Sequence, residues 1–232
     1  ENNTGEGFSE GVNKEKIFPM IALKGLVMFP GVTTSFDIGR AKSLVSLGEA
    51  SDGDKLVFVV AQKDKDDDDP IPENIYSVGV VCKIKRSFHF ENAINAHVEG
   101  LYRAKIVEYI ETEDKFTVKV VELPPIYEGG IELKASFDLV RNKYKEVLKG
   151  QKEGQNPATD RIFALTDADA FINIAAFRSD INETEKQKIL ETISVLEKCE
   201  AFLATLMAAE EIKDAEKRIN ERVRKSVEKG QK

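Results

Sequence analysis

Residues 17–123 carry short apolar runs separated by turn residues, and several of these runs alternate between apolar and polar positions. In Phe116–Val120 every second residue is apolar, which is the period of a strand with one buried face. The expected strands are Pro19–Leu23, Thr33–Ile38, Leu56–Gln62, Val78–Phe90, Ile94–Glu99, Ala104–Tyr109 and Phe116–Val121. One short helix fits Ala41–Glu49. Many short strands with a single helix predict a small, partly closed β-barrel or sandwich.

The pattern changes after Pro124-Pro125, because two prolines resist continuing a strand ladder. Residues 131–149 place apolar side chains at helical spacing, and Ala158–Lys229 contain no glycine or proline. The fold class is therefore α+β, with a β-rich half followed by an all-α bundle. The expected organisation is a disordered tail at 1–16, a β-rich domain at 17–123, a linker at 124–130 and a helical subdomain at 131–232.

Two helix starts can be read inside the second half. Thr166 with Asp169, and Asn182 with Glu185, each place a capping residue three positions before an acidic partner. No residue signals a stop between the second start and Gly230, so a long C-terminal helix is expected, and whether it runs in one piece from Asn182 stays open. If unbroken, its roughly 45 residues reach on the order of 65 Å.

The last part of this helix carries a narrow apolar stripe on a charged background. Its residues, spaced three or four apart, are Ile212, Ala215, Ile219, Val223 and Val227. Such a seam usually contacts a single other helix. Packing within its own bundle and pairing with a neighbouring copy both stay open, and the second makes these residues assembly candidates.

Composition excludes several classes of protein. The net charge of −7 disfavours a general nucleic-acid binder, which is usually basic. No apolar stretch approaches the roughly 18 residues that cross a bilayer, and the N-terminus has no signal-peptide core. Cys82 and Cys199 lie far apart, which fits buried reduced thiols in a cytoplasmic protein.

The acidic run from Asp64 to Asp69 does not have the pattern of a metal site. A calcium loop of the EF-hand type needs a glycine at its sixth position, where this sequence has Asp69. We interpret the run as a solvated turn between strands. His89 and His97, even with Cys82, lack the further ligand of a zinc site, so no metal is expected.

Motifs for catalysis are also missing. The chain has neither the GxxxxGK[ST] loop that cradles nucleotide phosphates nor the GxSxG turn of serine hydrolases. We therefore expect no catalytic residues, no enzyme activity and no cofactor in this chain.

Several segments together resemble the N-terminal domain of Lon proteases. They are "FPMIALKGLVMFPGVTTSFDIGRAKSLVSL", "VFVVAQKD", "DPIPENIYSVGVVCKI" and "HVEGLYRAKI", in the family's order and spacing. The later segments "TDADAFINIAAF", "ETEKQKILETISVLEKCEAFLATLMAAEEI" and "KRINERVRKSVEKGQK" are similar to its helical region. Lys24-Gly25 departs from the arginine–aspartate pair that the family often has there.

The resemblance implies a PUA-like barrel that recognises unfolded or damaged proteins and supports assembly of a hexamer. It also implies that the parent chain continues past Lys232 into an AAA+ ATPase, which uses ATP and magnesium, and a protease domain with a serine–lysine dyad. Two alternatives are a free-standing Lon-type adaptor and a PUA-like RNA-binding protein. For RNA, Lys83, Lys85 and Arg86 offer only a small basic patch.

Recognition of unfolded chains requires apolar surface that the fold leaves uncovered. The first candidates are the run between Gly25 and Gly31, where two glycines suggest a loop: Leu26, Val27, Met28, Phe29 and Pro30. The second candidates are Phe88 and Phe90, which flank His89 on an expected hairpin. For both sets the alternative is that they fill the core of the barrel.

Overall fold

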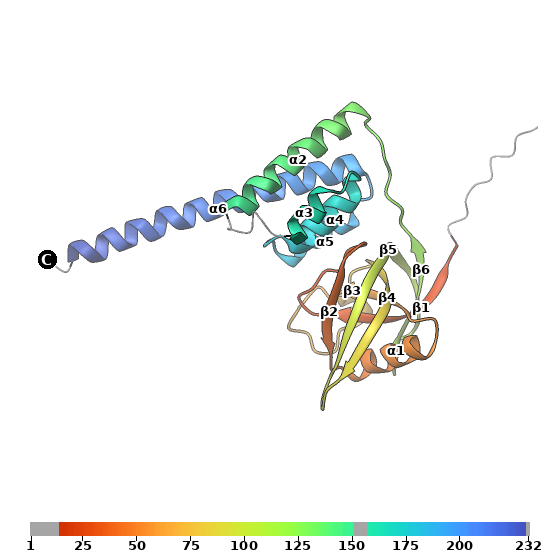
Figure 1. Cartoon of the computed structure of the whole chain (residues 1–232). Helices are drawn as coiled ribbons and strands as arrows, with labels where there is room; N and C mark the ends of the chain where they lie inside the picture. Colours follow the sequence, from red (N-terminus) through yellow and green to blue (C-terminus); the bar gives the residue numbers. More distant parts are fainter. Residues whose placement is uncertain (1–13, 151–156, 231–232) are drawn as a thin grey trace, which may run out of the picture.

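The computed structural model describes residues 14–150 and 157–230. Figure 1 shows a β-barrel with one helix, joined to a group of helices from which one long helix projects. The strands are β1 (Lys16–Leu23), β2 (Thr33–Ile38), β3 (Leu56–Ala61), β4 (Val78–His89), β5 (Ile94–Glu111) and β6 (Phe116–Glu122). Helix α1 (Ala41–Asp52) and the 3-10 turn η1 (Pro72–Asn74) lie between strands. Of the expected tail at 1–16, residues 1–13 lie outside the described residues.

The six strands form one sheet in the order β2-β5-β4-β3-β1-β6, and an additional β5–β6 pairing closes five of them into a ring. All pairings are antiparallel except β1 with β3, whose crossover contains β2 and α1. The predicted α+β class and the small barrel are confirmed. The two runs expected at Ile94–Glu99 and Ala104–Tyr109 belong to the single long strand β5.

The barrel strands are buried on alternating sides because successive side chains of a strand point to opposite faces. Along β1, Met20 and Ala22 join one apolar cluster, while Ile21 and Leu23 join the other. The second cluster is continuous with the helices and includes Tyr144. The core therefore connects the barrel to the helical part.

The helical part consists of α2 (Ile131–Gly150), α3 (Pro157–Phe163), α4 (Ala168–Arg178), α5 (Glu183–Glu191) and α6 (Val195–Gly230). Asn182 caps α5 by accepting a hydrogen bond from the backbone N–H of Glu185, as predicted. At α4 the cap is Asp167 rather than the expected Thr166. Its carboxylate accepts from the backbone N–H of Ala170 at 2.8 Å.

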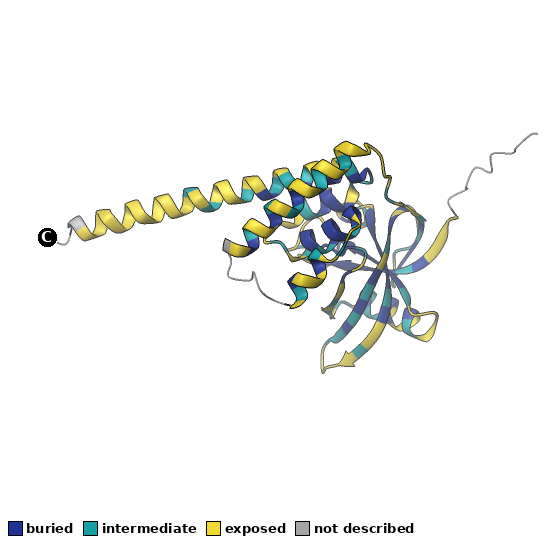
Figure 2. Ribbon diagram, turned by 45° about the horizontal axis from the view of Figure 1, so that its top comes forward, coloured by how far each residue is buried: buried dark blue, intermediate teal, exposed yellow. Residues whose placement is uncertain are grey.

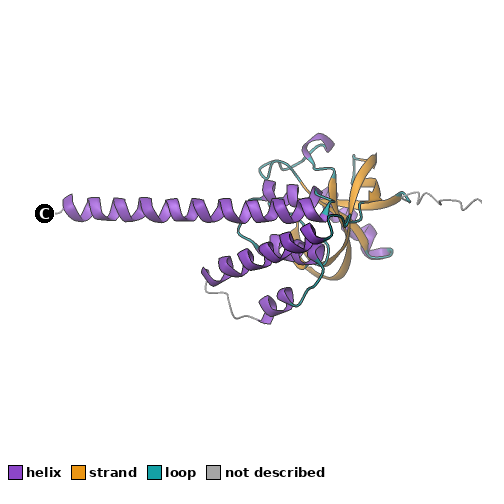
Figure 3. Ribbon diagram, turned by 90° about the horizontal axis from the view of Figure 1, so that it is seen from above, coloured by secondary structure: helices purple, strands orange, loops and turns teal. Residues whose placement is uncertain are grey.

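The helix that starts after Asn182 does not run in one piece to Gly230. The chain leaves the helix at Thr192, and Ser194 forms a parallel bridge with Ile126 before α6 begins. The Ser194 hydroxyl then accepts from the backbone N–H of Glu197 at 3.3 Å, which caps the new helix. Helix α6 has 36 residues, so it spans about 54 Å at 1.5 Å per residue. Figure 3 shows it projecting far beyond the other helices.

Candidate functional site

The first candidate surface, Leu26–Pro30, lies mostly inside the protein. Val27, Met28 and Phe29 are exposed by only 1%, 2% and 0%, while Leu26 and Pro30 are partly buried. The run does form a loop, but the loop folds inward and joins the larger apolar cluster. The structure therefore corrects the expectation that these three side chains are available to a partner.

The inward path of this loop depends on glycines at both ends and at one contact. Gly25 and Gly31 adopt positive φ angles of 63° and 77°, which favour glycine. The backbone N–H of Gly31 donates to the carbonyl of Gly100 at 2.9 Å. A Cβ atom on Gly100 would overlap the carbonyl oxygen of Phe29. The missing side chain of Gly100 thus lets the loop pack against β5.

The second candidate surface is the tip of the β4–β5 hairpin, and it is exposed. Phe88 and Phe90 expose 53% and 64% of their area. Phe88 lies in the ladder opposite Asn95, and the backbone N–H of Phe90 donates to the carbonyl of Ala93 at 2.8 Å, which closes the turn. We call Phe88 and Phe90 the hairpin tip. Two neighbouring aromatic side chains on a strand pair held by backbone hydrogen bonds offer a small, fixed apolar contact.

The stripe on α6 is also uncovered in this chain. Ile212, Ile219, Val223 and Val227 are each more than half exposed, and Ala215 is partly exposed. Figure 2 shows the distal part of α6 exposed along its length, away from the rest of the protein. Within the described residues, the stripe therefore does not pack on its own bundle.

Two of the three cations of the small basic patch already have partners. The ammonium of Lys83 donates to the carbonyl of Asp54 at 2.6 Å, and Lys85 pairs with Glu99 at 2.5 Å. Glu99 neutralises the charge of Lys85, and the carbonyl of Asp54 occupies a donor of Lys83, so both are less available to a phosphate backbone. The geometry gives no support to an RNA-binding groove at this place.

The acidic run folds into a turn that is held by its own backbone and by cations. The amide of Gln62 donates to the carbonyls of Asp64 and Asp67 at 2.5 and 2.8 Å. Asp68 pairs with Lys24, and the hydrogen bond from Lys24 lowers the pKa of the Asp68 carboxyl. Among the described residues, no group of three or more potential metal ligands is placed to hold an ion.

The two histidines lie toward the surface of the barrel, and the two cysteines are buried. His89 is exposed on β4, and Nδ1 of His97 lies 2.9 Å from the Ser35 hydroxyl on the barrel surface. Burial raises the pKa of both Cys82 and Cys199, for Cys199 to about 11. Both thiols therefore stay protonated at neutral pH and are poor nucleophiles.

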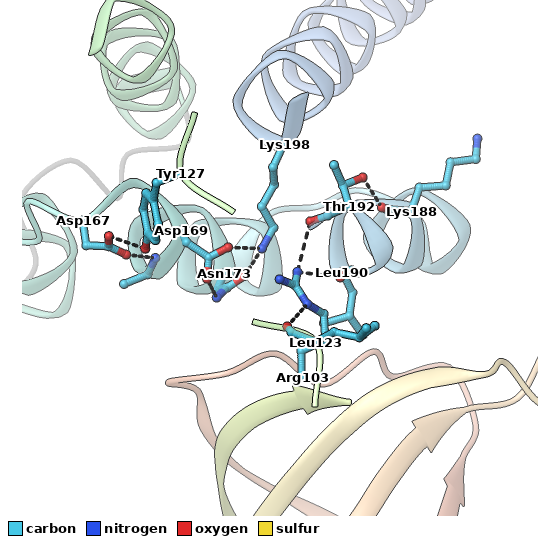
Figure 4. A network of polar contacts seen from close by, with 11 residues as sticks. Arg103, Leu123, Tyr127, Asp167, Asp169, Asn173, Lys188, Leu190, Thr192 and Lys198 are labelled. Carbon is cyan, nitrogen blue, oxygen red and sulfur yellow. Dashed lines mark hydrogen bonds and ion pairs between the residues drawn. The ribbon is translucent and has the colours of Figure 1, made fainter. Parts of the chain in front are cut away.

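A buried polar network joins the barrel to the helices (Figure 4). Arg103 on β5 is 3% exposed. Its guanidinium donates to the carbonyl oxygens of Leu123, Leu190 and Thr192 at 3.1, 2.9 and 3.0 Å. One side chain of the barrel therefore fixes the end of α5 and the chain that leaves β6.

The second half of the network lies between α4 and α6. The ammonium of Lys198, which is fully buried, donates to Oδ1 of Asp169 and to Oδ1 of Asn173, both at 2.6 Å. Burial lowers the pKa of Lys198 to about 8, against the opposing effect of Asp169. Burial also lowers the pKa of Arg103. We call Arg103, Lys198, Asp169 and Asn173 the junction network.

Sequence reasoning missed the junction network, although one signal was present. Lys198 lies three residues after Val195 and four before Phe202, a spacing at which a buried face normally carries apolar residues. A charge at such a position requires a buried partner. The sequence does not indicate that Asp169 is this partner.

Comparisons with known proteins agree with this architecture. Residues 17–207 match the family described as ATP-dependent protease La (LON) substrate-binding domain. A Lon protease of Bacillus thuringiensis (strain Al Hakam) is 30% identical over 98% of this chain and 29% of its own length. A Lon protease of Heliobacterium modesticaldum is 32% identical over 92% of this chain and 26% of its own length. The chain thus spans less than a third of these relatives.

Solved structures show the same fold. The N-terminal domain of a Mycobacterium avium complex Lon protease superimposes with a TM-score of 0.70 at 19% identity, over 83% of this chain and 98% of that one. A Lon N-terminal domain protein from Xanthomonas campestris gives 0.57 at 13% identity, over 82% and 98%. In the described residues, no helix is both long and apolar enough to cross a membrane.

Proposed function

Because this chain belongs to the family of Lon substrate-binding domains, we propose that it recognises unfolded or damaged proteins without catalysing any reaction itself. Residues 17–123 would make the contact, and the helical residues 131–232 would carry this contact surface. The observation that carries the proposal is the exposure of two aromatic side chains at the hairpin tip. Contiguous apolar surface that a folded protein leaves exposed commonly marks an interaction site.

The hairpin tip suits weak and permissive binding. Phe88 and Phe90 present aromatic surface without a deep pocket, so many different apolar segments can contact them. A contact of this size gives only low affinity by itself. Several copies in one assembly would raise the apparent affinity through effective concentration.

The exposed stripe on α6 supports a role in assembly. An apolar seam on an otherwise charged helix is stabilised when a second helix covers it. We propose that a neighbouring copy of the chain covers this stripe, within a hexamer of the parent protein. The length of α6, about 54 Å, would place the barrel away from the centre of such an assembly.

We further propose that the parent protein is an ATP-dependent serine endopeptidase of the cytoplasm with a serine–lysine dyad. ATP and magnesium would bind in the part of the parent that this chain does not span. The curated relatives are named Lon protease, and this chain covers 29% and 26% of the length of two of them. Delivery of captured proteins to the ATPase would then be the task of this chain.

Binding to an unfolded model protein tests the proposal. The 232-residue chain is titrated against reduced, carboxymethylated α-lactalbumin and against the native form of the same protein. Exchange of both hairpin phenylalanines, Phe88→Ser with Phe90→Ser, should weaken binding of the unfolded form about tenfold or more, since each side chain loses on the order of 1 kcal/mol of apolar burial. Leu139→Ser, an equally exposed site on α2, is the matched control. Equal affinity of both variants, or no binding of the unfolded protein, contradicts the proposal.

A further inference from the structure

Strand β2 lies at the end of the sheet and uses only one of its two edges. It pairs with β5 from Thr33 opposite Glu99 to Ile38 opposite Ile94. Just before this ladder, the backbone N–H of Gly100 donates to the carbonyl of Val32 at 2.8 Å. Since hydrogen-bonded positions alternate in an antiparallel pair, the next bonded residues are Thr34, Phe36 and Ile38.

The other residues of β2 direct their backbone groups away from β5. These residues are Thr33, Ser35 and Asp37, whose N–H and C=O groups form the free edge of the strand. In the part of the chain that the structure describes, no hydrogen bond reaches these six groups. An exposed row of this kind is a template for another strand.

The edge also lacks the features that usually prevent pairing. Proteins protect edge strands with lysine, proline, a bulge or an inward-pointing charge. The sequence of β2, TTSFDI, has neither lysine nor proline, and its single charge, Asp37, accepts a hydrogen bond from Asn95 at 2.8 Å. The ladder between β2 and β5 runs without a register shift over all six residues.

A groove runs beside the free edge. It has a volume of about 320 Å³ and is lined by residues 36–38 of β2, by the end of β1 with the following loop, and by the start of α1. Its apolar side chains come from Ile21, Ala22, Leu23, Leu26, Phe36 and Ile38. None of the described residues that line the groove belongs to β5, and the strand that faces β2 across it is β1.

We propose that the free edge of β2 binds an extended segment of an unfolded protein as an added strand. This inference rests on the proposed function and states how the substrate is held. Six residues of β2 match a segment of about 20 Å at roughly 3.3 Å per residue. The backbone of the segment pairs with Thr33, Ser35 and Asp37, and apolar side chains on one of its faces enter the groove.

The chemistry of the edge selects this occupant. Unpaired N–H and C=O groups in alternation are complementary to the backbone of any extended chain, whatever its sequence, and folded proteins keep these groups paired internally. The edge is also continuous with the hairpin tip. Asp37 of β2 lies opposite Asn95, and Asn95 lies opposite Phe88, so all three share one row of the sheet.

Peptides with methylated backbone nitrogens test this inference directly. The probe is a fluorescein-labelled peptide of alternating valine and threonine, measured by fluorescence anisotropy with the 232-residue chain. In an extended peptide the backbone N–H groups of valines and threonines point to opposite edges. One derivative carries N-methyl groups on all valines and the other on all threonines, so each loses the N–H donors along one edge of the peptide. We expect one derivative to bind about tenfold or more weaker and the other to bind like the parent, because only one edge of the peptide faces β2. Equal effects of both methylation patterns overturn the inference.

A variant of β2 provides a second measurement. Ser35→Pro removes one outward N–H and leaves the ladder to β5 intact, since proline is tolerated at the free side of an edge strand. Ser35→Ala keeps this N–H and isolates the loss of the hydroxyl that contacts His97. We expect Ser35→Pro to weaken binding of the peptide about tenfold and Ser35→Ala to leave its affinity unchanged. Circular dichroism and the melting temperature establish that the variant is folded, and if it is not, the methylated peptides decide.

The outcomes separate this inference from the proposed function. If unfolded α-lactalbumin binds through the hairpin tip but Ser35→Pro has no effect, the added strand is refuted and the proposed function stands. If neither the peptide nor unfolded α-lactalbumin binds, both are refuted. Pairing of two copies through β2, seen as dimerisation that the peptide does not displace, also overturns the inference.

Discussion

Arg103→Met should separate the unfolding of the barrel from that of the helices. Methionine keeps most of the apolar stem of the side chain, so the change removes the guanidinium with little loss of volume. The carbonyls of Leu123, Leu190 and Thr192 then lose their shared donor. Two of these carbonyls belong to the helical part, so one direct polar link across the junction disappears, while Gln187 of α5 still donates to the carbonyl of Val78 of β4 at 3.0 Å.

The size of the effect follows from the burial of the network. Each hydrogen bond from a charged donor contributes about 1.5–3 kcal/mol, but the three share one guanidinium and its desolvation cost. Loss of Arg103 also removes the repulsion by which it lowers the pKa of Lys198, which offsets part of the cost. We therefore expect the free energy of unfolding to fall by about 3–5 kcal/mol, as for other broken buried networks.

Urea unfolding and hydrogen exchange measure this effect together. Circular dichroism at 222 nm follows mainly the helices, and hydrogen exchange by mass spectrometry follows strands and helices separately. In Arg103→Met, the amides of α4–α6 should lose protection at lower urea concentrations than those of β3–β5. The matched control is Arg141→Met, which removes the donor to Phe163 and Leu165 inside the helical part and should not uncouple the two parts. A loss below about 1 kcal/mol, the range of a surface change, with coincident transitions would refute this reasoning.

Two further changes have clear expected results. Gly100→Ala should lower the free energy of unfolding by about 2 kcal/mol, on the order of other overpacked sites, because its Cβ would meet the carbonyl of Phe29. The control is Gly48→Ala in α1, where a Cβ atom meets open space, so this change should be neutral or stabilising. Thermal melts of both variants measure the difference. Lys198→Met should change the pH dependence of stability between pH 8 and 10. The buried ammonium has a pKa lowered to about 8, so the unfolded state binds more protons in this range and the stability of the unmodified chain rises with pH, on the order of 1–2 kcal/mol relative to the variant. Parallel curves for the two proteins in urea titrations at several pH values would exclude this titration.

The barrel could be predicted because its signals are local. Alternation along Phe116–Val120 and the turn residues between runs depend only on neighbours in sequence, and they indicated each strand. The break between α5 and α6 was also encoded locally, since Ser194 and Glu197 form the pattern of a capping box. The apolar stripe continues across this break, and its periodicity concealed the cap.

The position of Leu26–Pro30 could not be predicted in the same way. Its burial depends on Gly100, about 70 residues further along the chain, which leaves room for the carbonyl of Phe29. An apolar run between two glycines is equally compatible with an exposed loop and with a loop that folds inward. Only the pairing of distant strands decides between them, and periodicity carries no information about such pairing.

The junction network and the free edge of β2 have complementary roles: the first holds the barrel to the helices, and the second would hold the bound segment. Arg103 of β5 connects the barrel to the helices, since its partners lie at the end of α5 and in the chain after β6, and Lys198 of α6 connects this helix to α4. A pull on a segment held at β2 would therefore be transmitted through β5 and Arg103 to the helices rather than absorbed by a flexible linker. If a motor in the parent protein draws on that segment, the junction must resist until the added strand releases it. The backbone pairs at β2 can separate one after another, whereas the buried hydrogen bonds of Arg103 are shared by a single side chain and break together, so the edge should release first.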